Sequence, residues 1–333
     1  MKEIQITKNE SAQRLDRFLQ KLLPNASKGF IQKMLRKKNI KVNGQKAEPS
    51  TLLKIDDCIS LYFSDDTFDK FSRSAKKSDH PSMTSLGAHL QIIYESEQLL
   101  VVNKPAGLLT QPDKSGQISL IDQALSYLID KKAYDPQKEL TFVPACANRL
   151  DRNTSGIVLI PKDFTTLQTV NQAIRERQTK KIYLALVAGK TDSIGTCQHY
   201  FEKSATENLA TVTSLPDENG KQQSVLLTFK RLASNENTSL LEVDLKTGKS
   251  HQIRVQLAHI GHPIIGDPKY GDTYINQHFL DNCQLKSQLL HSATYCLSDQ
   301  CFTAPVPKMF LEVLKNLHYQ STLLKELTHG LLE

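Results

Sequence analysis

Residues 148–163, NRLDRNTSGIVLIPKD, join a charged turn to a run of aliphatic and β-branched residues. Asp151 stands between Arg149 and Arg152, directly before Thr-Ser-Gly and the strand-like GIVLIPK. An exposed Asp often pairs with Arg, and such a surface pair contributes only about 0–1 kcal/mol. A loop residue at the entrance to a buried strand is equally well placed for chemistry. The stretch alone leaves both interpretations open.

Strand-like runs recur on both sides of this stretch, in QIIYES, QLLVVNKP, KIYLALVAG, SVLLTFKRL and SLLEVDLK. Only the polar ASNENT separates the last two, so we expect them to form an antiparallel pair. Helical periodicity appears at 164–178 and at 250–260. Strands in series with occasional helices predict an α+β fold with a mixed, mostly antiparallel sheet flanked by helices.

A small module is expected at the start of the chain. One helix should carry an apolar stripe and end at Pro24, and Ser27 should cap a second helix. IKVNGQKA predicts a short hairpin with an Asn-Gly turn, and CISLYF predicts a further strand. The second helix has a basic face, which makes this layout typical of an RNA-binding unit; its candidate binding residues are Lys28, Lys33, Arg36 and Lys37.

The positive charge of the chain is concentrated in this module. Residues 1–64 hold 13 Lys and Arg against 6 Asp and Glu, whereas the remaining residues hold 29 of each sign. A basic excess confined to one small module is typical of a protein that binds a polyanion. A solubilising surface is the alternative.

The expected organisation is an RNA-binding domain at 1–64, a linker at 65–88 rich in Ser, Asp and Lys, and a catalytic domain at 89–333. The chain has no apolar run long enough for a membrane span and no signal-peptide core at its start, so we expect a cytoplasmic protein without a membrane partner. Six scattered cysteines without a Cys-x-x-Cys pair are expected to be reduced.

Several familiar motifs are incomplete. TGKS at 247–250 lacks the earlier glycine of a phosphate loop, because position 243 is Val. His251, His259 and His262 lack accompanying ligands at a recognised zinc spacing. The sequence contains no Gly-x-Ser-x-Gly elbow, so it does not indicate a serine hydrolase. Neither a metal nor another cofactor is therefore expected.

Four ordered motifs resemble the Rlu-type RNA pseudouridine synthases with an N-terminal alpha-L RNA-binding domain. The central one is Asn148-Arg149-Leu150-Asp151-Arg152-Asn153-Thr154-Ser155-Gly156, and the others are VVNKPAGLLTQP, KIYLALVAG and TGKSHQIRVQLAHIGHPIIGDPKYGD. The later segments LHSATYCL and FTAPVPKMF resemble the closing segment of the family. The resemblance covers nearly the whole chain. It departs from the family pattern at Asn148, Lys249 and Gln256, where His, Arg and a second His are usual.

The resemblance implies an isomerase that converts uridine to pseudouridine without a cofactor. Asp151 would be the catalytic carboxylate, acting as nucleophile or base, and Arg254 would keep it ionised in a dry pocket. Tyr183 would stack on the flipped-out base and assist proton transfer at its carbon 5, with Lys181 on the same face of the strand. Arg149 would fill the space that the base vacates. The expected partner is large-subunit ribosomal RNA, bound by a monomer.

Two alternatives of other classes stay open. One is a non-catalytic RNA-binding or ribosome-assembly factor, against which the joint presence of Asp151, Tyr183 and Arg254 argues. The other is a glycosidase, which would need a second carboxylate near Asp151. Asp163 and Asp244 are available for that role, but no sequence pattern pairs either with Asp151.

Overall fold

The computed structural model describes residues 1–72, 90–203, 209–217 and 222–329. The chain divides into two compact units, each described below by itself. The first contains Met1–His89, Ala124–Ala145 and Pro161–Thr169, and the second contains Leu90–Gln123, Cys146–Ile160 and Val170–Glu333. None of the helices in these described ranges is long and apolar enough to cross a membrane.

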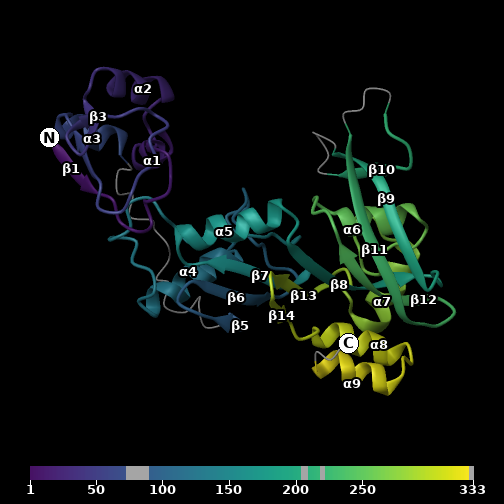
Figure 1. The fold of residues 1–333 in the computed structure, drawn as a ribbon. Coiled ribbons are helices and arrows are strands. Elements are labelled where there is room, and N and C mark those ends of the chain that lie inside the picture. The colour runs from purple at the N-terminus through teal and green to yellow at the C-terminus, as the bar shows by residue number, and fades with distance from the viewer. Residues whose placement is uncertain (73–89, 204–208, 218–221, 330–333) are drawn as a thin grey trace. The chain divides into compact units, whose positions relative to one another are not determined.

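The N-terminal part of the chain folds as the sequence predicts. A four-stranded sheet of order β1-β4-β2-β3 packs with two helices; the elements are β1 (Lys2–Gln5), α1 (Leu15–Leu22), α2 (Lys28–Arg36), β2 (Ile40–Val42), β3 (Gln45–Lys46) and β4 (Cys58–Leu61) (Figure 1). The Ser27 hydroxyl accepts the Phe30 N–H and caps α2. Asn43 and Gly44 both have positive φ, as a tight hairpin turn requires.

The prediction of a linker at 65–88 is wrong for its first residues. Helix α3 (Asp65–Phe71) begins there, capped by the Ser64 side chain. Phe68 is buried in the core of the N-terminal part, and the Phe71 ring lies 4.4 Å from that of Phe30. The aromatic residues of this polar segment therefore anchor it. The remainder of the predicted linker, 73–88, lies outside the described residues.

A large sheet lies almost wholly in the second unit. Its strands are β5 (Ile92–Glu95), β6 (Leu99–Lys104), β7 (Ser155–Pro161), β8 (Thr179–Ala188), β9 (Ile194–Lys203), β10 (Ala210–Thr213), β11 (Gln223–Ser234), β12 (Thr238–Leu245), β13 (Leu290–Leu297) and β14 (Gln300–Thr303). The helices are α4 (Leu120–Asp130), α5 (Phe164–Arg175), α6 (Gln252–His259), α7 (Thr273–Cys283), α8 (Lys308–Asn316) and α9 (Ser321–His329).

The strand order is β10-β9-β11-β12-β8-β13-β7-β6-β5, with β14 paired to β13. The expected antiparallel pair, β11 and β12, is confirmed. Strands β13 and β7 run parallel. The antiparallel pairs are β5–β6, β8–β12, β8–β13, β9–β10, β9–β11, β11–β12 and β13–β14. The predicted mixed, mostly antiparallel α+β fold is therefore confirmed.

The core of the second unit is largest near the centre of this sheet. Leu184 and Leu186 of β8 and Leu240 of β12 pack with Phe279 of α7 and Phe310 of α8. In Figure 1 α8 and α9 lie together at the C-terminal end of the chain, next to α7. Helix α6 packs near β9 and β10, where Val255 joins a smaller core. The loops that follow β6, precede β7 and follow β12 extend from strands of this sheet.

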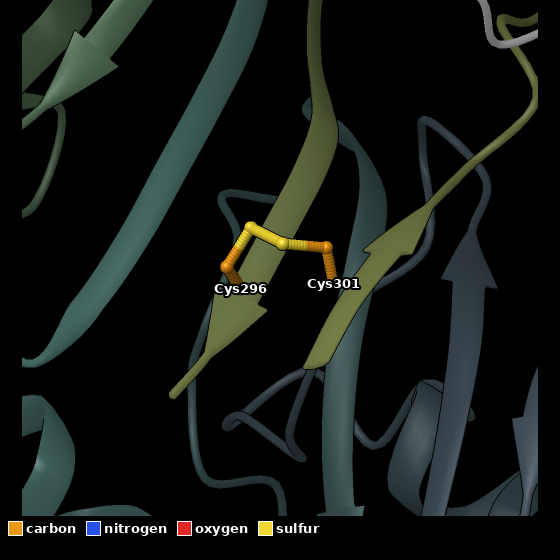
Figure 2. The surroundings of a disulfide bond; sticks show 2 residues. All are labelled: Cys296 and Cys301. Carbon is orange, nitrogen blue, oxygen red and sulfur yellow. A yellow bond between two sulfur atoms is a disulfide. The ribbon is translucent and has the colours of Figure 1, made fainter. Parts of the chain in front are cut away.

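The expectation that all cysteines are reduced is wrong for one pair. Cys296 and Cys301 face each other across the β13–β14 hairpin and form a disulfide, with their Cα atoms 4.0 Å apart (Figure 2). The hairpin register brings them opposite each other, which their spacing of five residues does not reveal. Cys58, Cys146, Cys197 and Cys283 are free.

Gly156 allows β7 to approach β13 closely. Its φ is +116°, and a Cβ there would lie 2.2 Å from the Ser292 carbonyl oxygen. Ser292 is paired with Tyr183 on its other side. We expect Gly156→Ala to destabilise the fold by about 2–5 kcal/mol in urea unfolding, since backbone strain and overpacking add. Gly116→Ala is the control: its φ is +69° but its Cβ would meet nothing within 4 Å, so a cost of only about 1 kcal/mol is expected.

Candidate active site

The turn that carries Asp151 is fixed by hydrogen bonds to the loop after β6. The Thr110 hydroxyl donates to the Leu150 carbonyl at 2.7 Å and accepts the Leu150 N–H at 3.2 Å. On the other side of Asp151, the Arg152 carbonyl accepts the Gly107 N–H at 2.8 Å, and Arg152 Nε donates back to the Gly107 carbonyl at 3.1 Å. Both neighbours of the acid are therefore held, so its position is set before any ligand binds.

Lys104 supports the same turn from inside the protein. Its ammonium is fully buried and lies 2.9, 2.8 and 3.0 Å from the carbonyl oxygens of Pro105, Leu108 and Arg152. Burial lowers the pKa of Lys104 to about 7, while the negative charge of Asp151 acts in the opposite direction. The three acceptors match the three N–H donors of an ammonium group and favour the charged form. Lys104 thus ties the loop after β6 to the turn before β7.

Arg254, on α6, bridges two carboxylates. Its Nη1 lies 2.8 Å from Oδ2 of Asp151, whereas its Nε and Nη2 lie 2.6 and 2.7 Å from the two oxygens of Asp267. The Asp267 side chain is wholly buried, that of Arg254 is 5% exposed and that of Asp151 is 25% exposed. The buried pair of Arg254 and Asp267 supports the structure, whereas the partly exposed carboxylate of Asp151 is the one that a ligand can reach.

Arg254 and Asp267 stabilise each other's charged forms. Burial raises the pKa of Asp267, but the hydrogen bonds and charge of Arg254 outweigh it and leave that pKa below its usual value. Burial lowers the pKa of Arg254, because it disfavours the charged form. The hydrogen bonds and charges of Asp267 and Asp151 outweigh burial, so the pKa of Arg254 is raised above its usual value. Backbone N–H groups of Lys269 and Tyr270 also donate to Asp267. Arg254 therefore presents a fixed positive charge to Asp151.

Tyr183 and Lys181 both lie on β8 but in different surroundings. Tyr183 is buried, and burial raises the pKa of its phenol, opposed by the Ser292 hydroxyl and reinforced by the charges of Tyr295 and Asp151. Lys181 is half-buried; burial lowers its pKa, while Asp244 raises it and Arg177 lowers it further. The structure brings Asp151 and Arg254 into contact and places Tyr183 within reach of the Asp151 charge, but it gives Lys181 the neighbours Asp244 and Arg177.

The other predicted binding residues are at the surface. Arg149 is exposed on the turn two residues before Asp151. Three basic residues of α2, Lys28, Lys33 and Arg36, and Lys37 directly after the helix are also exposed, and they belong to the first unit. The buried face of the same helix is made by Ile31 and Leu35. The charges therefore lie on the face that the core leaves open.

Two of the residues that differ from the usual family pattern have structural roles. The Asn148 amide donates to the Ile157 carbonyl and accepts the Leu159 N–H, so its side chain pairs with β7. Gln256 is fully buried and contacts the Cys197 carbonyl and His199 Nδ1 while accepting from Gln252. The third departure, Lys249, is exposed.

The three histidines of this region have separate partners. His251, His259 and His262 contact the Tyr270 hydroxyl, the Ser214 hydroxyl and the Ala188 carbonyl, respectively. Across the described ranges, no group of three or more His, Cys, Asp or Glu side chains is arranged to hold a metal ion.

Sequence reasoning missed Asp267 and Lys104. Helix α6 is buried almost all round, and Arg254 within it is only 4% exposed. A buried arginine needs more than one partly exposed carboxylate, and this requirement could have directed attention to the acid in PIIGDPKYGD. No sequence signal marked Lys104 as a ligand of three backbone carbonyls.

Comparison with known proteins gives the class of this fold and site. Residues 98–259 match the family model described as RNA pseudouridylate synthase, and residues 13–59 match the S4 domain. A solved human structure, RNA Pseudouridylate Synthase Domain Containing 4, shares the fold with a TM-score of 0.60 at 21% identity, over 72% of this chain and 97% of that one.

Curated relatives extend the similarity over most of the chain. The ribosomal large subunit pseudouridine synthase C of Rickettsia felis is 34% identical over 87% of this chain and 90% of its own length. An uncharacterized RNA pseudouridine synthase of Mycoplasma genitalium is 30% identical over 86% of each chain. The protein belongs to the RNA pseudouridine synthase family and is an enzyme with an N-terminal S4 domain.

Proposed function

We propose that this enzyme isomerises specific uridines of large-subunit ribosomal RNA, with Asp151 acting on the ribose of a flipped-out nucleotide. The observation that carries the proposal is the Asp151–Arg254 contact of 2.8 Å, backed by the wholly buried Asp267. It supplies one accessible carboxylate whose counter-ion is already in place. The choice of RNA rests on relatives that are named for the large ribosomal subunit.

The reaction makes limited demands on the protein. The bond from ribose C1′ to uracil N1 breaks, the base turns, and a bond from C1′ to C5 forms; the proton lost from C5 is balanced by one gained at N1. Asp151 would act at the sugar as nucleophile or base. Arg254 stabilises its negative form, and the bonds from Thr110, Gly107 and Lys104 keep the turn from moving while the base turns. No redox or group-transfer cofactor enters this balance.

Tyr183 would bind the base rather than remove its proton. Its raised pKa keeps the phenol protonated at neutral pH, so its ring can stack on the uracil and its hydroxyl can donate. The target nucleotide must leave its stack, at a cost of a few kcal/mol. Arg149, exposed on the same turn as Asp151, is the residue that we expect to occupy the vacated space. We assign Lys181 a weaker contact to the RNA, because it is half-buried and burial lowers its pKa.

The basic face of α2 is proposed to hold the RNA backbone. Changing Lys33, Arg36 and Lys37 together to Ala should weaken RNA binding and reduce the slope of log affinity against log salt by about 2–3, since each lost phosphate contact contributes about 0.7–0.9. Filter binding at several salt concentrations measures this slope. Replacing Lys286, Lys308 and Lys315, exposed residues of the second unit, removes the same charge and should leave the slope nearly unchanged.

Pseudouridine mapping tests the function as a whole. Ribosomal RNA from cells with and without the gene is treated with carbodiimide, and reverse-transcription stops locate pseudouridines. We expect one or more stops in large-subunit RNA to vanish without the gene and to return with the wild-type copy but not with Asp151→Asn. An unchanged large-subunit pattern would refute the proposed substrate. We expect the enzyme to act as a monomer in the cytoplasm, which sedimentation and cell fractionation can test.

A further inference from the structure

His251 occupies an unusual position at the start of α6. Its backbone has φ +60°, the left-handed region that few residues other than Gly, Asn, Asp and His enter. Its side chain makes no capping hydrogen bond and is only 13% exposed. Strained residues persist where the surrounding structure determines them, and they gather at functional sites. The ring points toward Asp151, with Nε2 4.0 Å from Oδ1.

The other ring nitrogen of His251 is held by Tyr270. The Tyr270 hydroxyl accepts the Ala210 N–H at 2.8 Å and lies 2.9 Å from His251 Nδ1. With one lone pair used by Ala210, the hydroxyl retains its proton and one further lone pair. If Tyr270 donates to Nδ1, the ring proton is on Nε2 and faces the carboxylate of Asp151. In the opposite tautomer the lone pair of Nε2 would face the negative oxygen, which is repulsive.

The surroundings of His251 favour a neutral ring. Burial lowers its pKa, the charges of Arg254 and Lys269 act in the same direction, and Asp151 and Asp267 act against them. Arg254 already supplies the positive charge at Oδ2 of Asp151. A neutral N–H at the other oxygen orients the carboxylate without removing its negative charge.

We propose that His251 is a positioning residue, which donates its Nε2 proton to Oδ1 of Asp151 in the RNA complex while Tyr270 fixes its tautomer. The inference rests on the proposed role of Asp151. A separation of 4.0 Å is too long for a hydrogen bond, but contacts of this kind are often long in a free enzyme and shorten when substrate closes the site. Asp151 is then held from two directions, by Arg254 at one oxygen and by His251 at the other.

Substitutions separate this role from a structural one. His251→Asn suits the left-handed backbone but is too short to reach Asp151, and it should lower the single-turnover rate by about tenfold or more, the effect of one hydrogen bond to a charged group. His251→Gln places an amide N–H near the position of Nε2 and should retain more activity. Gln284 already adopts the same backbone region in this chain. Tyr270→Phe keeps the ring, whose centroid is 5.2 Å from the Arg254 guanidinium carbon, and should lower the rate by about three- to tenfold.

The experiment uses the full chain and unmodified large-subunit RNA transcribed with tritium at uridine C5, and it follows tritium release at saturating enzyme. RNA affinity and melting temperature are measured alongside. His318→Asn is the matched control, because His318 also has a left-handed backbone (φ +58°) but is exposed on another part of the chain. We expect the control to be unchanged, and we expect His251→Asn to lose rate without losing affinity or melting temperature.

The double variant gives the sharpest outcome. If Tyr270 acts through His251, adding Tyr270→Phe to His251→Asn should cost no further rate. If Tyr270→Phe slowed the His251→Asn protein by the same factor as it slows the wild type, the inference would be overturned. A rate for His251→Asn equal to that of the wild type would overturn it as well. Asp151→Asn is assayed in parallel: an active Asp151→Asn protein would refute the proposed function itself, whereas an inactive one beside an unaffected His251→Asn would refute only the role of His251.

Discussion

The Asp151→Asn enzyme is expected to form no pseudouridine above background, a loss of at least about 10⁴-fold, which is typical when a reacting side chain is removed. The amide can keep a hydrogen bond from Arg254 Nη1, so the turn should hold its shape. It cannot, however, act as a nucleophile or accept a proton at the sugar. RNA affinity should stay within a few fold, because the proposed phosphate contacts lie on α2.

Asp163→Asn is the matched control for this change. The Asp163 carboxylate accepts the Thr166 N–H, a bond that an asparagine can also make, and its ion pair with Lys8 is a weak one at 3.8 Å. Full activity is therefore expected. Tritium release and direct nucleoside analysis of the RNA measure both proteins. Turnover by Asp151→Asn would exclude Asp151 as the reacting group, and loss of activity in Asp163→Asn would revive a mechanism with two carboxylates.

Arg254→Ala should lose both activity and stability. Removing the guanidinium leaves Asp267 buried without its ion partner, and breaking a buried pair in this way costs about 3–5 kcal/mol. At the same time Asp151 loses the guanidinium nitrogen that lies 2.8 Å from its Oδ2. Urea unfolding should show the stability loss, and single-turnover assays below the unfolding transition should show the loss of rate.

A second variant separates the two effects. In Arg254→Ala/Asp267→Ala no buried charge remains unpaired, so much of the stability should return while activity stays lost. If activity returned with stability, Arg254 would serve only the fold. If Arg254→Ala alone were as stable as the wild type, the assignment of Asp267 as a buried ionised partner would be wrong.

Local patterns made much of this fold predictable. The apolar stripe of α1, the Ser27 cap and the Asn43-Gly44 turn depend on residues close in sequence, and all three appear in the structure. The pair of β11 and β12 was predictable for the same reason, since a short polar loop joins them. The order of the motifs along the chain likewise predicts the family without reference to the fold.

Features that depend on distant contacts were not predictable. Helix α3 exists because Phe68 reaches a core built from other segments, although its local sequence is polar. Lys104 meets the Arg152 carbonyl 48 residues away, and His251 meets Tyr270 through a backbone conformation that no side-chain pattern signals. The Cys296–Cys301 bond depends on hairpin register. In each case the sequence shows the residue but not its neighbour.

The bonds from Thr110, Gly107 and Lys104 to the residues on either side of Asp151 make two separate stretches of chain behave as one part. An insertion between Pro105 and Thr110 would displace Asp151 without contacting it directly. We expect it to slow the reaction while RNA affinity stays the same. Anyone grafting this segment from a relative would therefore need to transplant residues 149–153 along with it.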